Sequence, residues 1–171
     1  MLKIIGSILI IIGTGVVGLK RVVKIRNHER SLSSVCAGLE LLESEISDML
    51  TPTKEALENV IQSYVSPFGK FVSNVLMSFD DLSQKSLYLI WNEALENTKE
   101  LVLNEKEKMV LSELGHILGR YSSYEQKKLI EYCKRRFEDA HKASIRELEK
   151  DSKVHAVLSL AAGIFISIIF I

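Results

Sequence analysis

The sequence contains few of the side chains that catalyse reactions or hold metal ions, and these are widely spaced. A metal site needs Cys, His or carboxylate ligands at matched spacings that bring them to one point of a fold. The histidines show no such spacing: they are His28, His116, His141 and His155. We therefore expect no metal site and no bound cofactor.

The two cysteines, Cys36 and Cys133, are far apart and form no CxxC pair. This pattern is typical of free thiols in a reducing compartment rather than of a disulfide framework. Such isolated cysteines are more often buried core residues than nucleophiles. The chain also has no phosphate-binding GxxxxGKS/T loop and no GxSxG or HExxH motif, so the sequence predicts a protein without enzyme activity.

Charge is balanced over the 171 residues, with 22 Lys and Arg against 22 Asp and Glu, so it gives no argument for binding nucleic acid. Apolar residues are concentrated at the two ends. We therefore expect three segments: an N-terminal transmembrane helix with a basic flank (1–25), a cytoplasmic helical domain (26–150) and a C-terminal transmembrane helix (151–171).

The two apolar runs are residues 4–19, which carry no charge, and residues 154–171. As helices they would measure about 24 and 27 Å, close to the roughly 30 Å hydrocarbon core of a bilayer. A signal peptide is the alternative for the first run, but its basic residues follow the run and no cleavage site is visible. A buried core helix is the alternative for the second run, which lacks the polar face of a surface helix.

Basic residues gather on the inner side of both runs, with five between Lys20 and Arg30 and four between Lys142 and Lys153. The positive-inside rule then places the middle of the chain in the cytoplasm and both termini outside. Small residues at helical spacing predict packing between the two spans, although such residues also occur on lipid-facing surfaces. The packing positions are Thr14, Gly18, Ser159, Gly163 and Ser167.

In the middle segment, apolar residues recur at alternating spacings of three and four, which is the a/d pattern of a packed helix. This seam comprises Leu32, Val35, Leu39, Leu42, Ile46 and Met49. After it, Thr51 suits a helix N-cap and Pro52 suits the first helical turn. A further helix is expected over residues 83–98, with Trp91 either in the core or at an interface.

Two capping-box patterns begin the last helices, Asn104 with Glu107 and Ser123 with Gln126. No proline or glycine lies between positions 120 and 163, which favours one long final helix. Alternating strand patterns are absent from the sequence. The predicted class is all-α: a bundle of about six helices flanked by the two transmembrane helices.

Two further patterns leave open whether their residues pack or bind a partner. Gly115 and Gly119 form a GxxxG pattern, for which helix packing and a helix C-cap are the simpler interpretations. An acidic stretch could be an ordinary solvated face or a docking surface for a basic partner. That stretch comprises Glu40, Glu43, Glu45 and Asp48.

Several motifs, taken in order, resemble the stage III sporulation protein AB family of endospore-forming bacteria. They are MLKIIG at the start, Glu45-Ile46, Thr51-Pro52, Glu55-Ala56, Trp91, the LxxLGxxLG pattern of 111–119, Gln126 and Gly163 in the apolar tail. Two positions depart from the family pattern. Thr53 stands where leucine usually follows Thr-Pro, and Ser122 or Ser123 stands where aspartate usually follows the second glycine.

The resemblance implies a component of the channel-like complex between mother cell and forespore, in the outer forespore membrane on the mother-cell side. The family's soluble domain is similar to the cytoplasmic domain of platform proteins of type II secretion and type IV pilus machines. Implied partners are a secretion-type ATPase of the same operon, stage III sporulation protein AA, and other membrane proteins of the complex. The candidate contacts are Glu40, Glu43, Glu45, the turn with Thr51, Pro52 and Glu55, and the turn with Leu114, Gly115 and Gly119.

Two other function classes compete with this membrane platform. A membrane-bound sensor or regulator would need a ligand pocket or an outside domain, and the predicted outside segments are only a few residues long. A membrane enzyme would need ionisable residues within its spans, and His155 is the only candidate there. The sequence leaves open whether the protein forms homo-oligomers.

Overall fold

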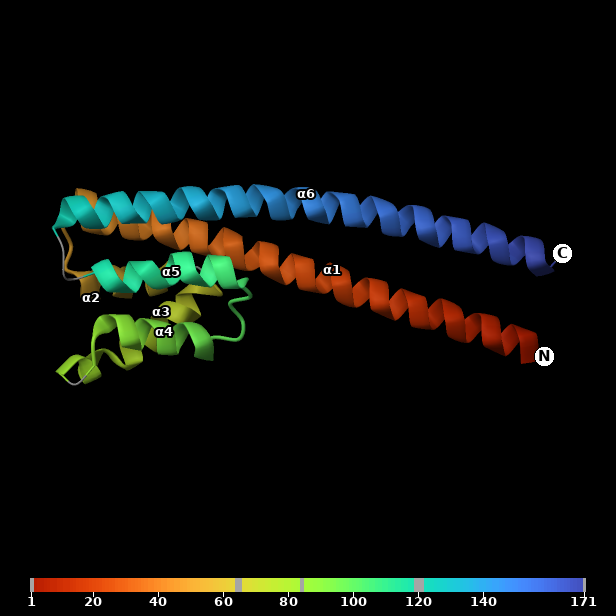
Figure 1. Cartoon of the computed structure of the whole chain (residues 1–171), viewed down its shortest axis with the longest axis horizontal. Coiled ribbons are helices and arrows are strands. Elements are labelled where there is room, and N and C mark those ends of the chain that lie inside the picture. Colours follow the sequence, from red (N-terminus) through yellow and green to blue (C-terminus); the bar gives the residue numbers. More distant parts are fainter. Residues whose placement is uncertain (1, 64–65, 84, 119–121, 171) are drawn as a thin grey trace. The chain divides into compact units, whose positions relative to one another are not determined.

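The computed structural model describes the backbone of residues 2–63, 66–83, 85–118 and 122–170, and the side chains of residues 22–63, 66–80, 82, 85–118 and 122–150. Every regular element in these ranges is helical, which confirms the all-α class (Figure 1). The elements are α1 (Leu2–Glu43), the π-helical turn η1 (Ser44–Asp48), α2 (Thr53–Gln62), α3 (Phe68–Met77), the 3-10 turn η2 (Phe79–Ser83), α4 (Leu87–Asn97), α5 (Glu105–Ile117) and α6 (Ser123–Phe170).

The chain divides into two compact units. One comprises the two ends of the chain, up to Asn27 and from Ala143, and the other is His28–Lys142, here called the helical domain. Among the residues with described side chains, no helix is long and apolar enough to cross a membrane. The predicted spans 4–19 and 154–171 lie outside those residues, as do the packing positions Thr14, Gly18, Ser159, Gly163 and Ser167, so these stay predictions.

The α1 seam forms one wall of the core of the helical domain. Its residues from Leu32 to Ile46 are buried as predicted. The prediction for Met49 is wrong, because its side chain is 68% exposed. The π-helical turn η1 follows α1 and changes the helical register, so the three-and-four spacing no longer continues along the buried face.

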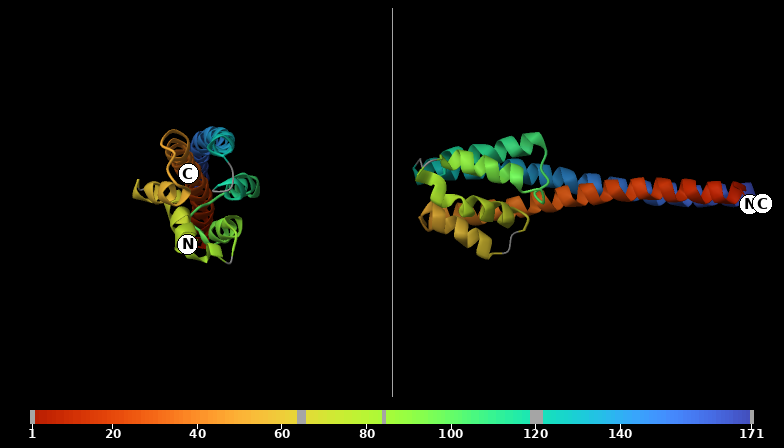
Figure 2. Two further views of the ribbon diagram at one scale, coloured as in Figure 1. Left: turned by 90° about the vertical axis from the view of Figure 1, so that its left-hand side faces the viewer. Right: turned by 90° about the horizontal axis from the view of Figure 1, so that it is seen from below.

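The opposite wall of the core is built on aromatic residues of α3 and α4. The rings of Phe71 and Trp91 meet edge to face, with centroids 4.8 Å apart. Trp91 is buried and donates its indole N–H to the carbonyl oxygen of Leu111 over 2.8 Å. Its place in the core, rather than at an interface, is thereby confirmed. Viewed along the helix axes, α2 and α5 lie to either side of α1 (Figure 2).

Several helix starts differ from the sequence prediction by a few residues. The N-cap of α2 is Pro52 rather than Thr51, and α4 begins at Leu87, with Ser86 as its cap. At α6 the reciprocal cap joins Ser122 with Glu125, one residue before the predicted pair. At α4 and α6 a neighbouring serine side chain accepts the free backbone N–H, so sequence spacing alone leaves the register ambiguous, whereas Pro52 makes no side-chain cap hydrogen bond. The capping box of α5 is confirmed.

Candidate functional site

The chain between α1 and α2, residues 45–55, is called the tip of the helical domain. After the π-helical turn, the N–H of Met49 donates to the carbonyl oxygen of Ser44 over 3.1 Å. The next residue, Leu50, has a φ of 55° in the left-handed region. A β-carbon is disfavoured there by about 1–2 kcal/mol, so surrounding contacts must hold this conformation.

Glu45 supplies the contacts that hold the tip. Its carboxylate oxygen Oε2 accepts hydrogen bonds from Thr51 Oγ1 over 2.8 Å and from Asn59 Nδ2 over 3.0 Å. Its carbonyl oxygen also accepts the N–H of Thr51 over 2.9 Å. Glu45 thus joins the end of α1 to the turn and to α2.

With the turn fixed in this way, two large apolar side chains extend into solvent. Met49 is 68% exposed and Leu50 is 69% exposed. Pro52 and Glu55 beside them are exposed as well. Adjacent exposed apolar side chains on a constrained backbone are suited to binding a protein partner, because little conformational freedom is lost when they are buried.

The first turn of α6 lies beside the tip. Lys127 Nζ is 3.8 Å from the carboxylate of Asp48, and Figure 1 shows the start of α6 next to the end of α1. The sequence analysis placed Thr51, Pro52 and Glu55 here but missed Met49 and Leu50. One signal was available: adjacent residues of a helix cannot both face a single seam, so one of this apolar pair had to point elsewhere.

The acidic stretch does not form one free surface. Glu40 is exposed, but Glu43 accepts a hydrogen bond of 2.6 Å from Lys134 of α6, and this contact raises the pKa of Lys134. The carboxylate of Glu45 is directed to Thr51 and Asn59. Of the three glutamates proposed from sequence, only Glu40 is exposed.

The second predicted contact, the turn after α5, lies in the interior where it is described. Leu114 and Gly115 are buried. A β-carbon on Gly115 would come within 2.6 Å of Trp91 Cγ, so this glycine permits the close packing of α5 on α4. This supports helix packing as the role of Gly115 and leaves Leu114 and Gly115 without surface for a partner. Gly119 lies outside the described residues.

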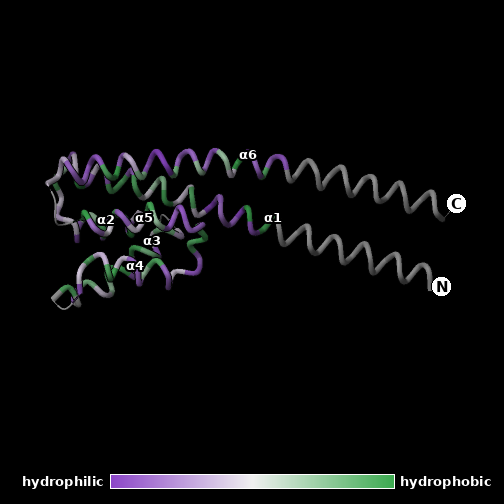
Figure 3. The backbone as a smooth tube through the Cα atoms, viewed as in Figure 1, coloured by the Kyte–Doolittle hydropathy of each residue, from purple (hydrophilic) through white to green (hydrophobic). Residues whose placement is uncertain are grey.

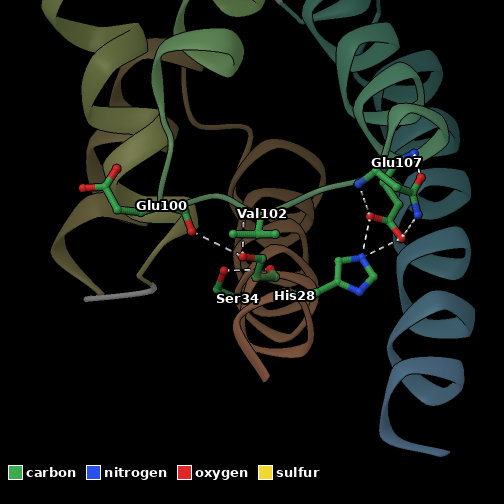
Figure 4. Close-up of polar contacts among 7 residues, drawn as sticks. His28, Ser34, Glu100, Val102 and Glu107 are labelled. Carbon is green, nitrogen blue, oxygen red and sulfur yellow. Dashed lines mark hydrogen bonds and ion pairs between the residues drawn. The ribbon is translucent and has the colours of Figure 1, made fainter. Parts of the chain in front are cut away.

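A polar cluster that sequence reasoning missed fixes the other end of the domain's α1 segment (Figure 4). His28 Nε2 lies 2.8 and 3.1 Å from the two carboxylate oxygens of Glu107. The same carboxylate accepts hydrogen bonds from the backbone N–H and side-chain amide of Asn104. Ser31 Oγ accepts the N–H of Val102 over 2.9 Å. We call these residues the anchor.

The anchor continues along α1 by one further turn. Ser34 Oγ donates to the carbonyl oxygen of Ser31 over 2.8 Å and accepts the N–H of Phe68 over 3.2 Å. The signal in the sequence was the spacing of three between His28, Ser31 and Ser34, which places polar residues on one helical face. Two turns of α1 are thereby tied to the α4–α5 connection and to the start of α3.

The side chains that could act as catalysts or metal ligands, the histidines and cysteines, make structural contacts or are buried. Besides His28, His141 Nε2 lies 2.8 Å from a carboxylate oxygen of Glu29, and the ring of His116 stacks on Tyr88. In the described part of the chain, no cluster of His, Cys, Asp or Glu could hold a metal ion. Burial raises the pKa of Cys36 to about 11 and that of Cys133 to about 12. Both thiols are therefore poor nucleophiles at neutral pH.

Comparison with known proteins gives a consistent result. The family model for stage III sporulation protein AB matches residues 3–171. The stage III sporulation protein AB of Bacillus subtilis (strain 168) is 25% identical over 170 residues, which cover 97% of each chain. A solved structure of a stage III sporulation protein AB matches with a TM-score of 0.63 and 22% identity, over 72% of this chain and 97% of that chain. These matches confirm the family resemblance, and the last one shows a common fold.

Proposed function

Because the chain belongs to the stage III sporulation protein AB family, we propose that it is a non-catalytic membrane platform of the complex between mother cell and forespore. In this role it docks a cytoplasmic secretion-type ATPase, stage III sporulation protein AA, at the membrane. The observation that carries the docking role is the tip, where Met49 and Leu50 are exposed on a backbone held by Glu45.

The part of the proposal that concerns attachment to the membrane rests on the sequence. Residues 4–19 and 154–171 would be retained spans in the outer forespore membrane, with the helical domain in the mother-cell cytoplasm. Thr14, Gly18, Ser159, Gly163 and Ser167 would bring the two spans together. Alkaline carbonate washing should leave the protein in the membrane fraction. When the protein is expressed in the plasma membrane of non-sporulating cells, protease added to protoplasts should spare the helical domain, and cleavage there would contradict the orientation.

The docking part of the proposal rests on the tip. A platform that receives an ATPase needs a contact that stays in one place while the ATPase changes shape. At the tip the apolar pair is held by hydrogen bonds between three elements, whereas a flexible loop would lose affinity through ordering. Thr51 and Glu55 supply polar groups beside this pair and Pro52 adds exposed surface, while Glu40 on α1 stays a further proposed contact. Large apolar side chains within a polar rim are typical of binding hot spots.

The test uses the full chain in detergent micelles and the purified ATPase, with affinity measured by microscale thermophoresis. We expect the double variant Met49→Ser/Leu50→Asn to bind the ATPase at least about tenfold more weakly, because loss of a binding hot-spot residue commonly costs about 2 kcal/mol. The matched control is Met77→Ser/Leu89→Asn, which removes two exposed apolar side chains elsewhere on the domain. Trp91 fluorescence verifies that both variants are folded.

Three outcomes would count against the docking proposal. They are unchanged binding by the tip variant, equal loss in tip and control variants, and absence of binding by the unmodified chain at micromolar ATPase. The last of these would favour the sensor or regulator function. Charge reversal is best applied at Glu40, since reversal at Glu43 or Glu45 would also break contacts within the domain.

A further inference from the structure

A groove on the surface of the helical domain runs between α4 and α5, remote in sequence from the tip. Leu95 forms part of its apolar lining, and Met109 projects at its side with 67% exposure. At one end the rings of Tyr88 and His116 stack with centroids 3.6 Å apart. The groove therefore combines apolar surface with a flat aromatic end.

The rim of this groove is acidic. It carries the three carboxylates of Glu96, Glu105 and Glu113 against the one ammonium of Lys108, which leaves two net negative charges when His116 is neutral. Lys108 already lies 3.2 Å from Glu96 and 3.6 Å from Glu105, and the hydrogen bond that it donates to Glu96 raises the pKa of Lys108. Further positive charge brought to the rim would be attracted.

The same domain carries a surface of complementary character on α6, which is mainly hydrophilic over its described part (Figure 3). An exposed ridge repeats every four residues and is here called the α6 ridge: Tyr124, Lys128, Tyr132 and Arg136. The ammonium of Lys128 lies 4.5 Å from the ring centroid of Tyr124. Residues four apart share one face of a helix, so the ridge presents alternating aromatic and basic side chains along a line.

The net charge of this α6 surface is opposite to that of the groove. Its exposed ionic residues in the helical domain are four cations and two anions, which gives two net positive charges: Lys128, Arg135, Arg136 and Lys142 against Glu125 and Asp139. Tyrosine and arginine are also the residue types most enriched at binding hot spots.

The two surfaces agree in length as well as in charge. The ridge from Tyr124 to Arg136 extends about 18 Å along its helix, and the 13 residues of α5 extend about 20 Å. A helix that places its side chains in a groove between two others is a recurrent mode of protein recognition. Three turns of α6 can therefore lie along three turns of the groove.

We propose that the α6 ridge of one copy of the chain docks in the α4–α5 groove of a second copy. The tyrosines would bury the apolar lining and Met109, and the basic residues would meet Glu96 and Glu113. Because one chain carries both complementary surfaces, a second copy satisfies the groove without any other partner. The contact joins two different surfaces, so it repeats from copy to copy and builds a ring or a row. This inference does not depend on ATPase docking.

Photo-crosslinking tests the geometry with the full chain reconstituted in liposomes. A photoreactive amino acid replaces Met109, whose exposure makes the replacement tolerable. After illumination, mass spectrometry of the dimer band should identify adducts in the peptide that contains residues 124–136 of the second copy. A dimer linked through two α5 segments, the absence of dimer, or transfer of the adduct to added ATPase would each overturn the proposal.

Charge exchange tests the chemistry and separates lost binding from misfolding. We expect Lys128→Glu/Arg136→Glu alone, and Glu96→Lys/Glu113→Lys alone, to lower the yield of crosslinked dimer about tenfold, because like charges then face each other. A mixture of the two variants should recover dimer, since the unmodified groove of the ridge variant meets the unmodified ridge of the groove variant, and the two reversed surfaces also have opposite charges. A misfolded variant would not be recovered.

The control variant Glu58→Lys/Asp80→Lys reverses two exposed charges outside both surfaces and should form dimer like the unmodified chain. Loss of dimer in this control, or no recovery in the mixture of variants that are folded by Trp91 fluorescence, would show that specific pairing of groove and ridge is absent.

Discussion

Two glutamates accept several hydrogen bonds at opposite ends of the domain's α1 segment, in different surroundings. At the anchor, Glu107 is 9% exposed and joins α1 to α5 through His28 and Asn104. At the tip, Glu45 is half-buried and joins α1 to α2 through Thr51 and Asn59. Both carboxylates bridge helices, but Leu101 near the anchor is buried, whereas the apolar pair near Glu45 is exposed.

The anchor uses its polar groups to stabilise the fold. Its hydrogen bonds fix the α4–α5 connection against α1, and Leu101 beside Val102 is buried. The tip uses its polar groups to hold a disfavoured left-handed Leu50 and an exposed apolar pair. Strained backbone with exposed apolar side chains lowers stability, so function is the better explanation for the tip and stability for the anchor.

The largest effect is expected at Gly38, which lies on α1 between the two ends. A β-carbon on Gly38 would overlap the buried ring of Phe68. We expect Gly38→Ala to lower the free energy of unfolding by about 3 kcal/mol, because the buried ring or α1 itself must shift to make room for the added methyl group. Urea denaturation of the full chain in detergent, followed by fluorescence of the single tryptophan Trp91, measures this.

The matched control is Gly69→Ala on α3, where a β-carbon would meet no atom within 4 Å. This control should be neutral or stabilise the domain by up to about 1 kcal/mol, because alanine favours helix. Equal destabilisation by both variants would mean that α1 does not pack on Phe68 as described, and the two ends of the segment could then not be compared as parts of one rigid helix.

The next effect concerns the anchor. We expect Glu107→Ala to destabilise the domain by about 2–3 kcal/mol, since it removes one half of the capping box and the carboxylate that holds the half-buried His28 to α5. Glu107→Gln keeps an acceptor oxygen and should cost about half as much. Urea denaturation again gives the value. A loss below about 0.5 kcal/mol would show that the anchor does not stabilise the fold.

These two predictions concern features that the sequence reveals to different degrees. The α1 seam from Leu32 to Ile46 and the capping box at Asn104 follow from local patterns and are confirmed, and Trp91 takes the core position, one of the two that its pattern left open. Local patterns suffice there because helix periodicity and capping depend on residues within one or two turns. Gly38 and Phe68 are far apart in sequence and come together only in the fold, so no rule of local spacing predicts their contact.

The candidate site was predictable only in part, for a similar reason. The turn at Thr51 and Pro52 follows from its residue types, so its position was found. The exposure of Met49 was not, because a π-helical turn is set by the contacts of Glu45 with Thr51 and Asn59. For Gly115 the sequence left packing and docking open. The neighbour across the helix, Trp91, decides between them.

A smaller change in stability is expected at the tip. Glu45→Ala should lower the free energy of unfolding by about 1 kcal/mol, because its partners Thr51 and Asn59 can turn to water instead. ATPase binding should fall more than this stability loss implies, since the exposed pair loses its fixed position. Glu55→Ala, at an exposed position nearby, is the control. A stability loss as large as that of Glu107→Ala would remove the distinction between anchor and tip.

The smallest expected effect has the opposite sign. Asparagine adopts the left-handed conformation more readily than leucine, so Leu50→Asn should stabilise the domain by about 0.5 kcal/mol. Leu89→Asn replaces an exposed leucine inside α4, where asparagine is the poorer helix former, and should destabilise by a similar amount. Urea denaturation of both variants provides the comparison.

If Leu50→Asn instead destabilises the domain, the leucine side chain stabilises the fold, and the tip resembles the anchor. If it stabilises the domain and weakens ATPase binding, stability and docking are opposed at this residue, as expected for a side chain retained for its partner.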